Sequence, residues 1–239
     1  MEWNDEGMIV GLRRHGEATV ILEALTARHG RHLGLVRDGR SRRQAATLQP
    51  GNRVALRWRA RLDEHLGAFS VEPLRLRPEL TLGDAATMDA LNWLCALLRM
   101  LPERDPHPEL YEASEVAADH LADARHARAL VARIELAMLE ALGFGLDLSC
   151  CAATGATQDL IYVSPRTGRA VSRAAGAPWA GRLLELPAFL KGAPEGEAPR
   201  PDEVEAGLRL TGFFLERDVF APRGMPEPAA RAAFIARGR

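Results

Sequence analysis

Cysteine is scarce in this sequence of 239 residues, which holds only Cys95, Cys150 and Cys151. An odd count with two adjacent residues gives no disulfide framework, which indicates a reducing compartment. The first residues, Met1 to Gly7, are acidic and include no apolar run, so we expect no signal peptide. No stretch approaches the roughly eighteen apolar residues that a membrane helix needs. We therefore expect a cytoplasmic protein with no membrane partner.

Enzyme motifs are also missing. The single lysine, Lys191, is followed by Gly192, so the Gly-Lys-Ser/Thr sequence of a phosphate-binding loop is absent. There is no Gly-x-Ser-x-Gly elbow, and the carboxylates are scattered rather than paired. His29 and His32 are close together, but no further His or Cys nearby completes a metal site. We expect no catalytic activity, no small-molecule substrate, no cofactor and no metal.

Basic residues are unevenly distributed. Thirty of the 31 basic residues are arginine, which a GC-rich genome explains, but codon bias does not gather charges. Between Arg28 and Leu62 the only acidic residue is Asp38, and the formal charge is +9, whereas the whole chain carries -1. The arginines of this stretch are Arg28, Arg31, Arg37, Arg40, Arg42, Arg43, Arg53, Arg57, Arg59 and Arg61. A field of this strength selects polyanions, of which nucleic acid is the most common.

The N-terminal third has the pattern of short strands. We expect strands within Met8–Leu12, Ala18–Leu25, Leu33–Val36, Asn52–Leu62 and Gly67–Leu76. Five short strands in about seventy-five residues favour a closed barrel of the oligonucleotide-binding (OB) type, which binds single strands through basic grooves. The intervening residues 37–50 have no clear period and hold four arginines, so we expect a flexible loop there.

The strand expected at Asn52–Leu62 has the clearest alternation. One face carries Val54, Leu56, Trp58, Ala60 and Leu62, and the other carries Arg53, Arg57, Arg59 and Arg61. Since Trp58 shares its face with aliphatic residues, we expect it in the core rather than as a platform for stacked bases.

The remainder of the chain favours helices. Helical periodicity and capping residues predict helices over about 84–101, 109–123, 125–142 and 202–218. Residues 146–178 are irregular and rich in Gly, Thr and Ser, with Leu160–Val163 as a possible strand. The predicted fold is therefore α+β: an OB-fold barrel domain over 1–80, then a helical domain over 81–239 with a small irregular insertion at 146–178.

Two segments carry a family resemblance. The run GMIVGLRRHGEATVILEALTARHGRHLGLVRDGRSRR, continuing to TLQPG, resembles the start of the RecO family of bacterial DNA repair and recombination mediator proteins. A second run, LGFGLDLSCCAATGA followed by YVSPRTGRAV, resembles the point where that family's helical bundle passes into a small cysteine-bearing module. The resemblance extends along the whole chain and is weakest over the last thirty residues.

The resemblance implies both a fold and a function. It implies an OB-fold barrel plus a helical domain, and a non-enzymatic activity that binds single- and double-stranded DNA and anneals complementary strands. It also implies two partners, namely RecR and the acidic tail of the single-strand binding protein. Together these load the recombinase on coated single strands.

One departure from the family concerns zinc. Many members hold zinc with two cysteine pairs, and Cys151 stands at the first ligand position of that pattern. Thr154, Ser172 and Ala175 stand where the other three ligands would fall. Because one thiol cannot complete a tetrahedral site, we predict no zinc. Packing of Leu160, Ile161, Tyr162 and Val163 would then hold the segment.

Two groups of residues are candidates for binding. We predict DNA contacts from Arg37, Arg40, Arg42, Arg43, Arg53, Arg57, Arg59 and Arg61. By resemblance, the tail of the single-strand binding protein would bind beside the apolar stripe of the 125–142 helix, near Arg125, Arg128 and Arg133. Two other function classes fit the same basic barrel: a module that binds structured RNA, and a non-catalytic scaffold for an acidic protein.

Overall fold

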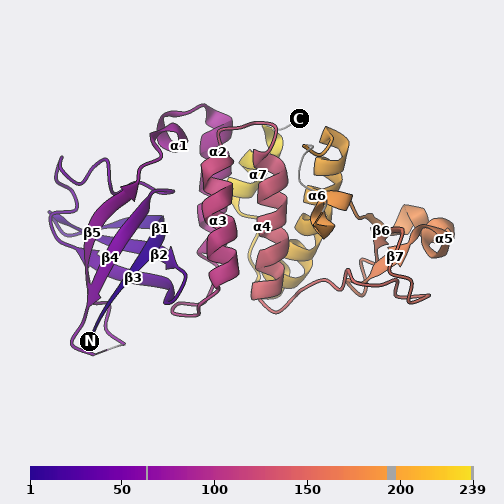
Figure 1. Cartoon of the computed structure of the whole chain (residues 1–239), viewed down its shortest axis with the longest axis horizontal. Coiled ribbons are helices and arrows are strands. Elements are labelled where there is room, and N and C mark those ends of the chain that lie inside the picture. Colours follow the sequence, from indigo (N-terminus) through magenta and orange to yellow (C-terminus); the bar gives the residue numbers. More distant parts are fainter. Residues whose placement is uncertain (63, 193–197, 238–239) are drawn as a thin grey trace. The chain divides into compact units, whose positions relative to one another are not determined.

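The computed structural model describes residues 1–62, 64–192 and 198–237 (Figure 1). The chain divides into two compact units. The first comprises Met1–Ala122 with Ala233–Arg239, and the second comprises Asp123–Ala232. Within the described ranges, no helix has the length and apolar character needed to cross a membrane.

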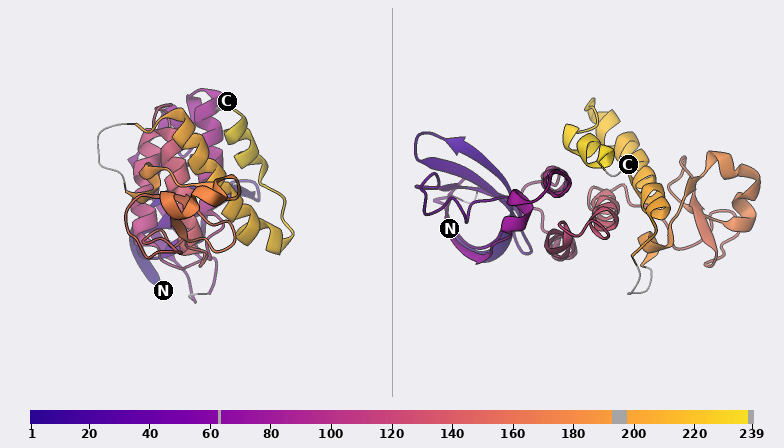
Figure 2. Two further views of the ribbon diagram at one scale, coloured as in Figure 1. Left: turned by 90° about the vertical axis from the view of Figure 1, so that its right-hand side faces the viewer. Right: turned by 90° about the horizontal axis from the view of Figure 1, so that it is seen from above.

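The first unit is built on a closed five-stranded barrel (Figure 1). Its strands are β1 (Glu2–His15), β2 (Thr19–Thr26), β3 (Gly30–Val36), β4 (Arg53–Arg59) and β5 (Ala68–Arg75). Their order around the barrel is β1-β2-β3-β5-β4. The pairing is antiparallel except where β3 meets β5. A five-stranded N-terminal sheet followed by helices confirms the predicted α+β class, and Figure 2 shows these strands from two further sides.

Strand β1 begins six residues earlier than the sequence pattern predicts. The segment from Glu2 to Met8 pairs with β4, and Glu2 lies opposite Arg59. The polar residues at the start of this segment gave no strand pattern in the sequence. Backbone hydrogen bonds to β4 hold the segment in the sheet. This pairing places the acidic N-terminal residues beside the arginines of β4.

The barrel core follows the alternation of β4. Val54, Leu56 and Trp58 are buried, and the Trp58 indole donates a hydrogen bond to the main-chain oxygen of Leu66 at 3.1 Å. The expectation that Trp58 belongs to the core is therefore confirmed. Leu62 was wrongly placed on this buried face: β4 ends at Arg59, and Leu62 is exposed.

Three helices complete the first unit: α1 (Pro78–Leu82), α2 (Ala85–Leu98) and α3 (Pro108–His120). The Asp84 carboxylate caps α2 by accepting a hydrogen bond from the Thr87 N–H at 2.8 Å. Arg77 is buried between barrel and helix, and it pairs with Glu115 and Asp119 of α3 at 2.7 and 2.6 Å. The sequence pattern had given no sign of this buried cation.

The second unit contains α4 (Ala127–Ala141), α6 (Pro201–Phe214) and the start of α7 (Ala229–Ala236). The expected helices at 84–101, 109–123, 125–142 and 202–218 are thus all present with slightly different ends. The buried carboxylate of Glu135 on α4 accepts hydrogen bonds from Arg231 Nε, at 2.9 Å, and from the Thr211 hydroxyl. This network joins α4 and α6 to the first turn of α7.

The segment predicted as irregular, 146–178, is part of a small module that extends to Lys191 and contains a sheet of order β7-β6-β8. Its elements are β6 (Leu160–Val163), β7 (Ala170–Ser172), β8 (Leu184–Glu185), the short helix α5 (Arg173–Gly176) and the 3-10 turns η1 (Ala177–Arg182) and η2 (Ala188–Lys191). The expected strand at 160–163 is confirmed. Leu160 and Val163 are buried as expected, whereas Ile161 and Tyr162 are only half-buried.

Candidate nucleic-acid interface

The arginine face of β4 lies on the outside of the barrel but is not free. Arg57 and Arg59 both pair with the Glu2 carboxylate, and the Nε of Arg59 lies 2.7 Å from it. Arg53 donates from Nε to Glu6 at 2.9 Å. Hydrogen bonds from Arg59 and then Arg57 lower the pKa of Glu2, which keeps this carboxylate charged. The first strand therefore neutralises much of the charge that the sequence of β4 displays.

A groove of about 610 Å³ runs over this face and has walls of both signs. We call it the outer groove; its lining residues are Asn4, Asp5, Glu6, Arg28, Ala55, Leu56, Arg57, Ser70 and Glu72. Arg28 is itself paired with Asp5 at 3.2 Å. Ion pairs between exposed side chains contribute only about 0–1 kcal/mol each. A phosphate can therefore displace these carboxylates, but it must compete with them.

A different part of the barrel gathers uncompensated cations. Arg13 and Arg14 end β1, opposite Ile21 and Val20 of β2, and Val20 lies opposite Val36 at the end of β3. Arg37 follows Val36 directly, so the end of β1 and the start of the 37–50 loop lie at the same end of the barrel. We call this the basic end; its residues are Arg13, Arg14, Arg37, Arg40, Arg42 and Arg43.

Hydrogen bonds fix the loop to the adjacent turn. The Arg40 N–H donates to the Ala18 oxygen at 3.3 Å, and Arg40 Nη1 donates to the Glu17 oxygen at 2.6 Å. Further along the loop, Leu48 is buried in the barrel core. The loop is thus held to the barrel at Arg40 and at Leu48, and the expected flexibility of the segment stays a prediction.

The six arginines of the basic end are exposed, and they outnumber the carboxylates in the same turns. Among the described residues, no carboxylate forms a salt bridge with any of the six, and the acidic residues in the same turns are Glu17 and Asp38. Arg61, just beyond β4, likewise has no salt bridge to a described residue. A surplus of unpaired guanidinium groups is the feature that attracts phosphate backbones.

Sequence reasoning missed Arg13 and Arg14. Both lie more than twenty residues before Arg37, outside the arginine-rich stretch, and only the pairing of β1, β2 and β3 brings them beside the loop. The available signal was the run Arg13-Arg14-His15-Gly16, whose glycine adopts a left-handed conformation and marks a turn between strands.

The aromatic residues of the barrel form a cluster instead of an exposed platform. Trp3 stacks on His29 with ring centroids 4.0 Å apart, and it also contacts Trp58 and Phe69. His29 Nδ1 lies 2.9 Å from the Asp5 carboxylate. Across the part of the chain that is described, no group of three or more His, Cys, Asp or Glu residues is arranged to hold a metal ion.

Comparison with known proteins agrees with the barrel-plus-helices arrangement. The family description "Recombination protein O N terminal" matches residues 1–77, and "Recombination protein O C terminal" matches residues 82–225. The chain belongs to the RecO family.

Relatives within this family cover nearly the whole chain. A protein of Chelativorans sp. (strain BNC1) is 60% identical over 99% of this chain and 95% of its own length. Proteins of Methylocella silvestris and Mesorhizobium japonicum are 58% and 57% identical over 99% of this chain, and over 95% and 93% of their own lengths. All three bear the name DNA repair protein RecO.

Three of the residues that the resemblance places at zinc-ligand positions lie around one sulfur. Cys151 is buried, and its Sγ accepts a hydrogen bond from the Ser172 N–H at 3.2 Å. Hydrogen bonds from Ser172 and then Thr154 lower the pKa of the Cys151 thiol to about 6. Three of the four positions that resemblance assigned are therefore neighbours, although only one of them provides a thiolate.

The three arginines predicted to bind a partner near α4 differ in their exposure and in their contacts. Arg125 precedes the helix, which begins at Ala127, and pairs with Asp123 at 3.2 Å. Arg133 is exposed on α4, and its Nε donates to the Phe189 oxygen at 3.0 Å. Arg128, in the first turn of α4, is half-buried. Arg133 thus lies against the chain that follows the small sheet, whereas Arg125 stands apart from the helical stripe.

Proposed function

We propose that this RecO-family chain is a non-enzymatic recombination mediator that binds single- and double-stranded DNA and anneals complementary strands. In this proposal residues 1–80 form an OB-fold domain that binds DNA. Residues 81–239 form a helical domain that binds partners. Membership of a family whose relatives are named DNA repair proteins supports the DNA part of the proposal.

The observation that carries the proposal is the unpaired charge of the basic end. Its arginines come from the end of β1 and from the 37–50 loop, and hydrogen bonds from Arg40 join this loop to the β1–β2 turn. Guanidinium groups bind phosphate oxygens in a forked geometry and position a strand without reading its bases. Binding should therefore be strong at low salt, weak at high salt and independent of sequence.

Annealing follows from the same electrostatics. Two complementary strands repel one another through their phosphates, and a dense cationic surface reduces that repulsion while both strands are bound. Arg53, Arg57, Arg59 and Arg61 would extend the surface once phosphates replace Glu2 and Glu6. We assign them a secondary role because three of them already have carboxylate partners.

The partner side of the proposal rests on the helical domain. We propose that Arg133, with Arg128 and Arg125 in supporting roles, attracts the acidic tail of the single-strand binding protein. An exposed cation beside the apolar stripe of α4 suits an acidic peptide with an apolar end. RecR is proposed as the second partner from the family relationship, with no surface assigned to it.

The small sheet module is proposed to be a degenerate form of the family's zinc module. The neighbouring positions of Cys151, Thr154 and Ser172 support this interpretation. With one thiol there, packing of Leu160 and Val163 would replace metal ligation.

A strand-annealing assay tests the proposal. Two complementary oligonucleotides, one of them coated with single-strand binding protein, should pair faster in the presence of the protein, and high salt should suppress the effect. RNA offered as competitor at equal length should displace the DNA only weakly. Preferential binding of structured RNA would support the RNA-binding alternative, and failure to retard any nucleic acid at low salt would support a scaffold for an acidic protein.

A further inference from the structure

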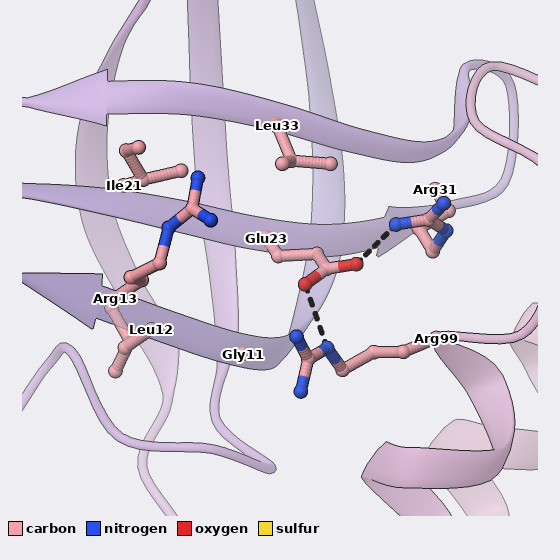
Figure 3. Close-up of a pocket in the computed structure, with 8 residues that line it drawn as sticks. All are labelled: Gly11, Leu12, Arg13, Ile21, Glu23, Arg31, Leu33 and Arg99. Carbon is pink, nitrogen blue, oxygen red and sulfur yellow. Dashed lines mark hydrogen bonds and ion pairs between the residues drawn. The ribbon is translucent and has the colours of Figure 1, made fainter.

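A second concavity of the barrel lies on the outer face of β1, β2 and β3 beside the end of α2 (Figure 3). We call it the arginine pocket, and its volume is about 200 Å³. Its lining residues are Gly11, Leu12, Arg13, Ile21, Glu23, Arg31, Leu33 and Arg99. All of them belong to the first compact unit. Of its three arginines, only Arg31 belongs to the arginine-rich stretch of the sequence.

A buried carboxylate organises this pocket. Glu23 is 6% exposed, and it pairs with Arg31 on one side and with Arg99 Nε at 2.7 Å on the other (Figure 3). Arg31 is fully engaged, since its Nε also donates to the Leu101 oxygen at 2.7 Å and its Nη2 lies 3.8 Å from Glu103. Glu23 therefore positions two guanidinium groups and cannot also neutralise Arg13.

Two guanidinium groups, those of Arg99 and Arg13, can bind a ligand. Arg99 uses only Nε for Glu23, and within the described chain its two terminal nitrogens have no hydrogen-bond partner. Arg13 is exposed and has no salt bridge to a described residue. Figure 3 shows the Arg13 guanidinium beside Ile21 and the Arg99 guanidinium beside Gly11, with the Glu23 side chain between the two arginines. An anion between them would meet donors from both sides.

The absence of a side chain at Gly11 keeps this space open. A Cβ atom there would lie 3.0 Å from Glu23 Oε2 and 3.2 Å from Arg99 Nε, closer than ordinary contacts. A larger residue would crowd the Glu23 and Arg99 side chains where they meet. Glycine therefore suits this position because both side chains approach its Cα closely, and not because the backbone is left-handed.

We infer that the arginine pocket binds one backbone phosphate of DNA, held between Arg13 and Arg99, with Glu23 as the residue that positions Arg99. The inference rests on the proposed DNA binding and extends it to a named subsite. Arg13 belongs both to the pocket and to the basic end, so a strand bound at the basic end reaches the pocket without a break. Arg99 would be a DNA contact contributed by a helix outside the barrel.

A double-mutant cycle on Arg13→Gln and Arg99→Gln tests this inference. Binding of a labelled oligothymidine would be followed by fluorescence anisotropy at several salt concentrations. Loss of a charge-assisted contact should weaken binding about tenfold for each single variant. Because both residues bind the same phosphate, the double variant should be weakened by clearly less than the product of the two effects. Its salt slope should fall by about 0.7, the value for one phosphate on a single strand.

Matched controls separate this subsite from general charge. Arg173→Gln removes a similarly exposed arginine with one carboxylate partner, Asp159, and should leave affinity and slope unchanged. Arg99→Lys keeps the charge and should preserve the salt slope while losing part of the affinity. Independent effects of Arg13 and Arg99, or no effect of Arg99→Gln, would overturn the inference.

The remaining outcomes distinguish the inference from the proposed function. If Arg99→Gln is silent while variants of Arg37, Arg42 and Arg43 weaken binding, the subsite is wrong and the DNA-binding proposal stands. If the unaltered protein binds no DNA, both fail. If Arg99→Gln instead abolishes binding of an acidic peptide with a free terminal carboxylate, the pocket takes a peptide and the inference is overturned.

Discussion

Arg40 donates a hydrogen bond from Nη1 to the main-chain oxygen of Glu17 at 2.6 Å. This contact joins the 37–50 loop to the β1–β2 turn, two segments separated by about twenty residues of sequence. Together with the pairing of β1, β2 and β3, it keeps Arg13 and Arg14 on one surface with Arg37, Arg42 and Arg43. The grouping of these arginines is therefore a property of the strand pairing and not of the arginine-rich stretch alone.

Glu2 should act as an internal competitor of DNA. Glu2→Gln frees Arg57 and Arg59 from their shared carboxylate, so single-stranded DNA should bind about three- to tenfold more tightly at low salt, with a steeper salt dependence. Fluorescence anisotropy measures this change. Glu79→Gln removes the same charge from an exposed site on α1 and should have little effect. Weaker binding by Glu2→Gln would show that DNA does not use the β4 face.

Arg77 should be the most important cation for the stability of the first unit. It is buried with Glu115 and Asp119, and Arg77→Met leaves these carboxylates without their buried partner, which costs about 3–5 kcal/mol. Urea unfolding followed by circular dichroism measures the loss. Arg75→Met removes an exposed arginine that also pairs with Asp119, and should cost under about 1 kcal/mol. Equal losses for the two variants would contradict this assignment.

The Cys151 thiol should make stability depend on pH. Its pKa in the folded protein is lowered from 9.0 to about 6, so its stabilising contribution is fully present above pH 9 and is lost as the pH falls through 6. Urea unfolding of the unaltered protein and of Cys151→Ala at pH values above and below 6 should therefore diverge at the higher pH. Burial raises the pKa of Cys95 to about 12, so this thiol stays neutral. A constant difference across pH would contradict the prediction.

The sequence predicted features that depend on local alternation and periodicity. The alternation of Val54, Leu56 and Trp58 with arginines placed β4 and its buried face, and helical periodicity over 125–142 placed α4. It did not predict features that depend on register. Glu2 lies beside Arg57 and Arg59 only because β1 pairs with β4, and polar residues gave the start of β1 no apolar signal.

Strand register also determines which arginines of the candidate site have carboxylate partners, and the sequence does not show this. The loop arginines are exposed and form no salt bridge with a described carboxylate, whereas Arg53, Arg57 and Arg59 have carboxylate partners that no composition count reveals. Arg13 and Arg99 lie outside the arginine-rich stretch, and only the folded chain brings them to one pocket. Net charge along a sequence thus overestimates a field wherever a neighbouring strand is acidic.

The most direct test of the central claim compares two matched triple variants by the salt dependence of single-stranded DNA binding. One, Arg13→Gln/Arg14→Gln/Arg37→Gln, removes three unpaired charges of the basic end. The other, Arg53→Gln/Arg57→Gln/Arg59→Gln, removes three paired charges of β4. We predict that the first lowers the salt slope by about 2, corresponding to three phosphate contacts, and that the second lowers it by less than 1. A larger loss from the β4 variant, or a slope that the basic-end variant leaves unchanged, would contradict the account.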